Sequence, residues 1–208
     1  MKEQVIIVGA SEHGKIVTDI VQLAGDQVVG FLDDNPNFPN SFVGLSVLGS
    51  IDKFENYKSC QFIIAIGNAA IRKRISEKMK NVQWYTAIHP SAIVSDVEVS
   101  IGEGTTVMEN AVINAGTKIG KHCIVNSSAV VEYDNQIGDF VHVSVGVKLA
   151  GNVHVGNGTW IGIGASVSNN LGICENCMIG AGAVVGHSID EQGIYVGVPS
   201  RKICIKES

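Results

Sequence analysis

Aliphatic residues recur at every sixth position through most of the second half of the chain, without a gap. The fifteen members of this series are Ile101, Val107, Ile113, Ile119, Val125, Val131, Ile137, Val143, Leu149, Val155, Ile161, Val167, Ile173, Ile179 and Val185. Glycine follows several of them at intervals of eighteen residues, from Gly102 to Gly156. A six-residue period is typical of a parallel β-helix. The eighteen-residue spacing predicts three hexads per coil and about five coils stacked into a triangular prism.

The repeat is absent from the first part of the chain, and the pattern changes near Pro90. We therefore expect two domains, 1–88 and 89–208. In the first domain, β-branched runs alternate with helical patterns, which predicts strands over 5–8, 28–32 and 62–66 with helices between and after them. This order predicts a Rossmann-like α/β unit the size of one mononucleotide-binding half.

Two turns of the first domain carry residues suited to a nucleotide. The glycine turn at 9–14 has Ser11 where dinucleotide-binding folds have their second glycine, which argues against NAD(P) but leaves a phosphate at the helix N-terminus open. Asp33 and Asp34 end the second strand about twenty residues past the turn, where such folds place a ribose-binding acid. Both acids, and the turn at 67–68, are also ordinary strand-ending and helix-capping residues.

Charge and hydropathy exclude several classes of partner. The net charge is −5, and the basic residues form no cluster beyond 72–74, which argues against nucleic acid or an anionic membrane. The apolar run before Gly9 is too short for a signal peptide or a membrane span. We therefore expect a cytoplasmic protein that acts on a small molecule, without membrane insertion.

The cysteines are odd in number and scattered, which favours reduced thiols over a disulfide framework. They are Cys60, Cys123, Cys174, Cys177 and Cys204. Cys174 and Cys177 form the one CxxC pair, but Cys177 has the same inward phase in the repeat as Cys123. Core packing is therefore favoured over zinc or redox use.

His142 is the outstanding polar residue of the repeat. Side chains alternate along a strand, so His142 points outward if Val141 and Val143 point into the prism. Its apolar and small neighbours indicate a contact surface, and prisms with such faces associate about a symmetry axis, so we expect a trimer. Tyr133 lies half a coil earlier, so the two side chains could converge only across a subunit interface. An interface histidine without a chemical role is the alternative.

Seven segments resemble a known family. They are GASEHG at 9–14, FLDD at 31–34, AIGN at 65–68, HPSA at 89–92, FVHVS at 140–144, LAGNV at 149–153 and GVPS at 197–200. Over its whole length the chain resembles the hexapeptide-repeat sugar O-acyltransferase family, the group that contains sialic acid O-acetyltransferases and bacillosamine and perosamine N-acetyltransferases. The resemblance implies a left-handed β-helix, a homotrimer with active sites between subunits, and acetyl-CoA as co-substrate without a metal.

The resemblance also assigns site residues. It places the nucleotide sugar on the first domain, with candidate contacts Ser11, His13, Gly14, Asp33, Asp34, Gly67, Asn68 and Arg72. It places acetyl-CoA between prisms, near His142, Gly151, Gly162, Ile163, Gly180, Ala181 and Arg201 or Lys202. The candidate catalytic residues are His142, Tyr133 and Asp134.

Tyr133 is a departure from the family pattern. Amino-sugar members of the family have a Glu-His-Asp/Glu motif with histidine as general base, whereas this chain reads Glu132-Tyr133-Asp134. A phenol, whose usual pKa is about 10, is a poor base at neutral pH. Three explanations stay open: the amine attacks with little assistance while Tyr133 orients it and Asp134 or water takes the proton, His142 takes over, or catalysis is crippled.

The sequence therefore predicts an acetyl-CoA-dependent N-acetyltransferase that acts on the amino group of a nucleotide-linked amino deoxy sugar. UDP is the expected nucleotide. The amine would attack the thioester directly, because no cysteine has the flanking base that a covalent route needs. O-acetylation of sialic acid or another sugar hydroxyl is the first alternative, and the loss of histidine at 133 counts against it. A catalytically silent trimer that binds a nucleotide sugar is the second.

Overall fold

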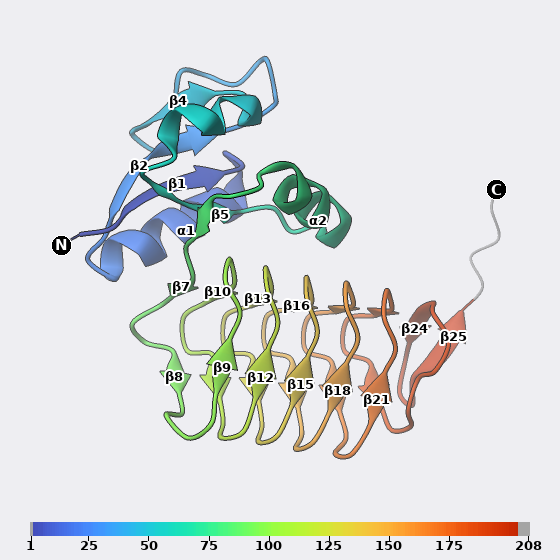
Figure 1. Cartoon of the computed structure of the whole chain (residues 1–208). Helices are drawn as coiled ribbons and strands as arrows, with labels where there is room; N and C mark the ends of the chain where they lie inside the picture. Colours follow the sequence, from blue (N-terminus) through green and yellow to red (C-terminus); the bar gives the residue numbers. More distant parts are fainter. Residues whose placement is uncertain (1, 204–208) are drawn as a thin grey trace.

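The computed structural model describes residues 2–203, so Met1 and residues 204–208, including Cys204, lie outside the described part of the chain. Figure 1 shows a small α/β domain above a prism of stacked strands. The second domain is a left-handed parallel β-helix, which confirms the predicted fold class. No helix within residues 2–203 has the length and hydropathy needed to cross a bilayer.

The first domain contains the predicted strands and helices together with three further strands. Its elements are β1 (Gln4–Val8), α1 (Glu12–Leu23), β2 (Gln27–Leu32), β3 (Ser41–Phe42), β4 (Leu45–Gly49), the 3₁₀ helix η1 (Ile51–Tyr57), β5 (Gln61–Ile64), α2 (Ala69–Lys78) and β6 (Gln83–Trp84). The strand order is β3-β4-β2-β1-β5-β6, with only β3 antiparallel to its neighbour. The carboxyl ends of β1, β2 and β5 therefore meet at one edge, where a parallel sheet binds ligands.

The β-helix has three sheets, each named here by its first strand. The β7 sheet contains β7 (Ala87–Ile88), β10 (Thr106–Val107), β13 (Ile124–Val125), β16 (His142–Val143), β19 (Trp160–Ile161), β22 (Met178–Ile179), β24 (Ile194–Val196) and β25 (Arg201–Ile203). The β8 sheet contains β8 (Ile93–Val94), β11 (Val112–Ile113), β14 (Val130–Val131), β17 (Lys148–Leu149), β20 (Ser166–Val167) and β23 (Val184–Val185). The β9 sheet contains β9 (Ser100–Ile101), β12 (Lys118–Ile119), β15 (Gln136–Ile137), β18 (His154–Val155) and β21 (Gly172–Ile173).

Paired residues in neighbouring coils are eighteen positions apart, as Ile124 and His142 are, which confirms three hexads per coil. β7 pairs with β10, so the β-helix begins at Ala87, two residues before the predicted boundary. The last described strands do not form a regular coil. β24 extends the β7 sheet, and β25 folds back and pairs with β24 in antiparallel fashion.

The hexad series lines the inside of the prism, as predicted. Val141 and Val143 are fully buried, whereas His142 between them faces outward and is half-buried. Polar residues on the inside are matched by backbone groups: the hydroxyl of Thr105 donates to the Gly120 carbonyl (2.9 Å) and accepts from the Cys123 amide (3.0 Å). Each such residue ties one coil to the next without leaving a buried polar group unpaired.

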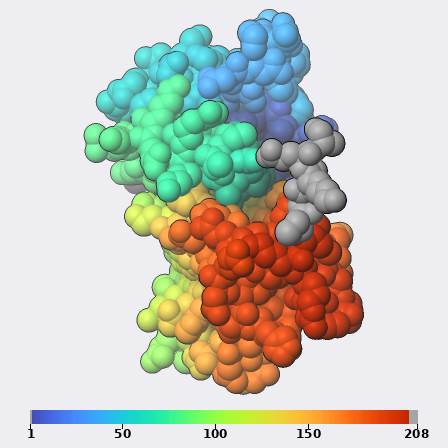
Figure 2. All heavy atoms as spheres, turned by 90° about the vertical axis from the view of Figure 1, so that its right-hand side faces the viewer, coloured from blue at the N-terminus to red at the C-terminus, as the bar shows by residue number. Residues whose placement is uncertain are grey.

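The first domain covers the early coils of the β7 sheet. Ile124 points outward from β13 but is only 1% exposed, because it packs with Val17 and Ile20 of α1 in one shared cluster. Figure 2 shows the two domains seated against each other. α1 does not cover the later coils of the same sheet. His142 and Trp160 of these coils border a cavity between the β-helix and the start of α2.

Candidate active site at the domain junction

The two domains enclose a cavity of about 500 Å³ at their junction. The first domain contributes the turn with Gly67 and Asn68 and the first residues of α2. The β-helix contributes His142 and Trp160 of the β7 sheet and the turns that precede these strands. The structure thus brings together residues that the sequence predicted separately for the sugar and for the chemistry.

Trp160 and Asn126 hold the His142 ring. The Trp160 indole is stacked on it, with ring centroids 5.4 Å apart and planes within 3°. The indole N–H donates to Ser144 Oγ (2.7 Å), and the amide nitrogen of Asn126 lies 3.4 Å from His142 Nε2. An amide NH₂ can only donate, so this contact makes Nε2 an acceptor and leaves the ring proton on Nδ1. His142 Nδ1 is buried, and the ring meets the backbone of Gly67, a contact that acts to raise its pKa but falls outside normal hydrogen-bond geometry.

Burial lowers the pKa of His142 to about 4, with Arg72 and His13 adding to the effect through their charge. His13 lies in the first turn of α1, and burial followed by the charge of Arg72 lowers its pKa to about 4 as well. Both rings are therefore neutral at pH 7. A neutral imidazole can donate one hydrogen bond and accept another, which suits binding to a carbonyl or an amine.

Arg72, predicted as a contact to the nucleotide sugar, is buried between the two domains. It is 1% exposed and donates to four carbonyls: His122 (2.9 Å), Ile66 (3.1 Å), Gly67 (2.7 Å) and Phe140 (2.6 Å). Its hydrogen bonds are used within the protein and its side chain is closed to a ligand. The prediction of direct substrate contact is therefore not supported at this position, because the helix face that carries Arg72 meets the second domain.

Asp33 and Asp34 border a second cavity, of about 360 Å³, at the carboxyl edge of the first sheet. Asp33 accepts hydrogen bonds from the amides of Ala10 and Asn35, and Asp34 accepts one from the amide of Ile51, all at 2.8 Å. The two acids therefore brace the glycine turn and the loop that follows β2 while they face an open space. This is compatible with the predicted contact to a nucleotide.

The glycine turn is shaped by its own residues. Ser11 caps α1 by accepting from the Gly14 amide (3.3 Å), and its hydroxyl donates to the Ala65 carbonyl (3.2 Å). A Cβ on Gly14 would lie 2.5 Å from the carbonyl oxygen of Gly9, so only glycine fits there. Asn68 similarly caps α2 through the amide of Ile71 (3.0 Å). Ser11, Gly14 and Asn68 therefore hold the two turns in shape beside the ligand spaces.

Tyr133 and Asp134 lie away from His142, at the corner between the β8 and β9 sheets. They border an open hollow of about 570 Å³, and Tyr133 is 54% exposed. Its ring lies over Gly151, where a Cβ would come within 2.4 Å of Cζ. The two candidate catalytic positions thus face different sides of one chain, as the half-coil spacing predicts.

The remaining predicted acetyl-CoA contacts form a third group. Gly162, Ile163, Gly180 and Ala181 occupy successive coils at the corner between the β7 and β8 sheets, and Ile163 is 56% exposed. Arg201 is exposed at the start of β25 and donates to the Ser200 carbonyl (2.9 Å). Within one chain these residues do not share a cavity with Gly151 or Tyr133.

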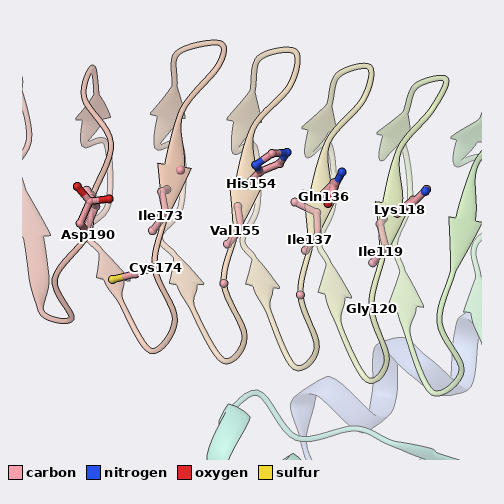
Figure 3. Close-up of a pocket in the computed structure, with 14 residues that line it drawn as sticks. Lys118, Ile119, Gly120, Gln136, Ile137, His154, Val155, Ile173, Cys174 and Asp190 are labelled. Carbon is pink, nitrogen blue, oxygen red and sulfur yellow. The ribbon is translucent and has the colours of Figure 1, made fainter.

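Figure 3 shows another hollow, an open groove of about 640 Å³ along the β9 sheet. Lys118, Gln136 and His154 project from successive coils beside it. Cys174 borders the groove, and its sulfur lies 3.4 Å from that of Cys177, which is buried in the prism core. Within residues 2–203 no cluster of three or more His, Cys, Asp or Glu side chains is placed to hold a metal ion.

Sequence reasoning missed several residues that border the cavities, among them Trp160, Arg74 and Lys78. Trp160 stands eighteen positions after His142, so the repeat alone places it in the next coil on the same outer face. Arg74 and Lys78 border the cavity with Asp33 and Asp34, and they lie one turn apart on α2. Their helical spacing is visible in the sequence as a signal of a shared face.

Comparisons with known proteins match the two domains separately and together. The family described as PglD N-terminal domain matches residues 4–79, and the family described as bacterial transferase hexapeptide (six repeats) matches residues 98–132. PerB from Caulobacter crescentus, solved in complex with CoA and GDP-perosamine, is 31% identical with a TM-score of 0.91, and the alignment covers 97% of each chain.

Two further proteins are similar. The acetyltransferase domain of PglB from Neisseria gonorrhoeae is 30% identical with a TM-score of 0.90, and the match covers 97% of this chain and 100% of that one. The UDP-N-acetylbacillosamine N-acetyltransferase of Bacillus subtilis is 37% identical over 120 residues, 51% of each chain. The chain spans about half or less of the length of the curated relatives that it matches.

Proposed function

The chain belongs to the family of hexapeptide-repeat sugar acetyltransferases with a PglD N-terminal domain, and from this we propose that it transfers an acetyl group from acetyl-CoA to an amino group of a nucleotide-linked amino deoxy sugar. UDP is the nucleotide that we favour. The relatives named above carry different nucleotides, UDP in one name and GDP in another, so the nucleotide is part of the proposal.

The observation that carries the proposal is the cavity shared by the two domains. It has the turn with Gly67 and Asn68 on one side and the stacked pair of His142 and Trp160 on the other. A nucleotide sugar held by the first domain along Asp33, Asp34 and this turn would reach the β-helix with its sugar end. Holding two reactants at such a junction supplies much of the rate enhancement of a bimolecular transfer.

The proposed reaction is a direct transfer. The sugar nitrogen forms a bond to the acetyl carbon, the carbon–sulfur bond breaks, and the departing CoA thiolate is protonated while the nitrogen loses one proton. In the proposed reaction His142, a neutral imidazole at pH 7, hydrogen-bonds the thioester carbonyl or its oxyanion. Burial raises the pKa of Cys123 and of Cys177 to about 12, so neither thiol is a nucleophile for an acyl-enzyme route.

Tyr133 decides how well the proton is removed. In the proposed reaction its hydroxyl orients the amine, and Asp134 or water accepts the proton. An amine is nucleophilic once it has lost its own proton, so it needs a weaker base than a sugar hydroxyl does. This difference supports N-acetylation over O-acetylation for a chain with tyrosine at this position.

A homotrimer would bring Tyr133 of one subunit to His142 of its neighbour. The β8 sheet carries outward Ile93, Val112, Val130 and Val184, of which Ile93 is 65% exposed. The β9 sheet instead carries outward Ser100, Lys118, Gln136 and His154, all exposed. The β8 sheet also carries outward Lys148 and Ser166, and the β7 sheet exposes Trp160 and Met178. Apolar side chains on the β7 and β8 sheets, against the polar row on the β9 sheet, support association through the first two.

A catalytically silent trimer that binds a nucleotide sugar is the alternative that Tyr133 favours. Loss of a general base lowers rates by about 10²- to 10⁴-fold, enough to leave a binding protein. The two possibilities share the fold and the ligand and differ in turnover.

The test is an assay of CoA thiol release from acetyl-CoA with a panel of UDP-, dTDP- and GDP-linked amino sugars, run beside the Tyr133→His variant. We expect release with one sugar in the native chain and no large gain in the variant, because the amine needs little base assistance, whereas a gain of about 10²- to 10⁴-fold would show that tyrosine disables the base position. Turnover in the variant alone would identify a disabled base. Binding of a nucleotide sugar without turnover in either protein would support the silent trimer and contradict the proposed reaction.

A further inference from the structure

Arg72 connects the two halves of the junction cavity by main-chain contacts alone. Nη1 donates to the carbonyls of Ile66 and Gly67, at the end of β5, while Nε and Nη2 donate to the carbonyls of His122 and Phe140 in two successive coils. The planar fork of a guanidinium can make such bonds in two directions at fixed geometry, which a lysine ammonium cannot do.

The residues that Arg72 holds adjoin the candidate reacting groups. Gly67 and the following Asn68 border the cavity on the first domain, and Phe140 precedes His142 by two residues. Aromatic contacts brace the same coils: the His122 and Phe140 rings are stacked 5.3 Å apart, and Trp84 meets His122 edge-on at 4.6 Å. One side chain therefore fixes the turn of the first domain against the strand that carries His142.

We propose that Arg72 is a positioning residue, which sets the distance between the bound sugar amine and the acetyl group by clamping the Gly67–Asn68 turn to the coil that leads into His142. The inference rests on the proposed function for its chemical meaning. A displacement of about 1 Å between reacting atoms can cost about 100-fold in rate, so a clamp between two domains that each hold one reactant acts on turnover.

Arg72 also acts through its charge. Within residues 2–203 no carboxylate forms an ion pair with it, although it is buried. Its charge lowers the pKa of both His13 and His142, after the larger effect of burial. The other charged groups around the same cavity are Lys73 of α2 and Asp139 and Glu175 of the turns before β16 and β22. Removal of the Arg72 charge should therefore raise both histidine pKa values toward 6.5.

Two substitutions separate the geometric effect from the electrostatic one. Arg72→Lys keeps the charge but loses the fork, so we expect kcat to fall about 10- to 100-fold with the KM values for acetyl-CoA and sugar changed little, since each domain keeps its own binding surface. Arg72→Gln loses both the charge and the guanidinium fork. We therefore expect a similar fall in kcat and, in addition, a rise in the pKa values of His13 and His142. A fall in kcat without a change in KM, together with the histidine titrations, distinguishes a positioning role from a simple loss of stability.

Met79→Ala is the matched control. Met79 follows α2, is 1% exposed and packs in the core of the first domain, away from the junction cavity. We expect it to lower the Tm as much as Arg72→Lys does, or more, while kcat is unchanged. Equal losses of kcat in Met79→Ala and Arg72→Lys would show a merely structural role and overturn the proposal.

Two measurements on the unliganded protein need no turnover. Amide hydrogen exchange over residues 66–72 and 140–144 should be faster in Arg72→Lys than in the native chain, and unchanged there in Met79→Ala. Histidine ring resonances should titrate near the native pKa in Arg72→Lys and higher in Arg72→Gln. If no sugar is acetylated, the proposed function fails, while unchanged exchange in Arg72→Lys, or kcat within twofold of native, would overturn the clamp.

Discussion

Tyr133 owes its orientation to a neighbouring glycine. Its ring lies across Gly151 of the next coil, at a point where an added Cβ would come within 2.4 Å of Cζ and 2.5 Å of Cε2. Gly151 is not in the left-handed backbone region, so the need for glycine comes from the ring and not from the backbone. A side chain at position 151 would turn the phenol away from this corner.

We predict that Gly151→Ala lowers kcat about 10-fold and the free energy of unfolding by less than about 1 kcal/mol, because the half-exposed ring can swing into solvent. Steady-state kinetics and denaturant unfolding measure the two effects. In a Tyr133→Ala background the same change should have no effect on either, and a persisting effect would show that the ring is not the cause. Gly186→Ala, where a Cβ meets open space, is the control.

At the scale of the coil, close stacking explains the glycines eighteen residues apart. A Cβ on Gly102, Gly120, Gly138 or Gly156 would lie 2.4–3.1 Å from atoms of the following coil, mostly backbone. The next position in this series is Cys174, which follows β21, the last strand of the β9 sheet. The next pass of the chain meets this strand only through a single bridge between Ile173 and Ile189, so the glycine pattern stops where regular strand pairing gives way to one bridge.

We predict that Gly156→Ala lowers the free energy of unfolding by about 1–3 kcal/mol, because its Cβ would lie 2.4 Å from the amide nitrogen of Glu175 and backbone atoms cannot move aside. Denaturant unfolding checks this. Gly172→Ala, on the same sheet with open space around its Cβ, should change stability by less than about 0.5 kcal/mol. Equal effects of the two substitutions would show that coil contact is not the reason for glycine.

At the scale of the whole molecule, the domain junction concentrates buried histidines. Burial is the main cause that lowers the pKa of His13, His122 and His142, each to about 4. All three lie close enough to Arg72 to be affected by its charge. The union of the domains therefore requires these rings to be neutral.

We predict that stability falls with pH between about 6.5 and 4. In this window unfolded histidines take up protons that the folded rings do not, so falling pH lowers the free energy of the unfolded state relative to the folded one, by on the order of 2 kcal/mol for each of His13 and His142. Thermal unfolding across this range checks the slope. His13→Gln should flatten it, whereas a change of the exposed His154 to Gln should not.

The six-residue series predicted the β-helix, the inward and outward phases and the separation of Tyr133 from His142, because each hexad repeats one geometry. Trp160 could have been found in the same way, since it stands one coil beyond His142. A period of this kind places any residue relative to any other within the repeat. It therefore locates partners across coils as well as core positions.

Residues at the junction could not be predicted in this way. Ile124 has the outward phase and should be exposed, but α1 covers it. Arg72 stands on a charged stretch of a helix, typical of a solvated surface, yet it is fully enclosed because that face meets two coils. Periodicity within each domain contains no information about how the domains dock.

The contacts of Arg72 have a consequence for how such proteins diversify. All four of its partners are main-chain oxygens, so these bonds need only the left-handed backbone conformation that positions 122 and 140 both adopt. A substitution at either position that keeps this conformation would leave the four bonds intact, although a change at 122 would also remove the contact between the His122 and Trp84 rings. The seam between the domains therefore combines a backbone geometry that every coil can offer with side-chain contacts that belong to this chain alone.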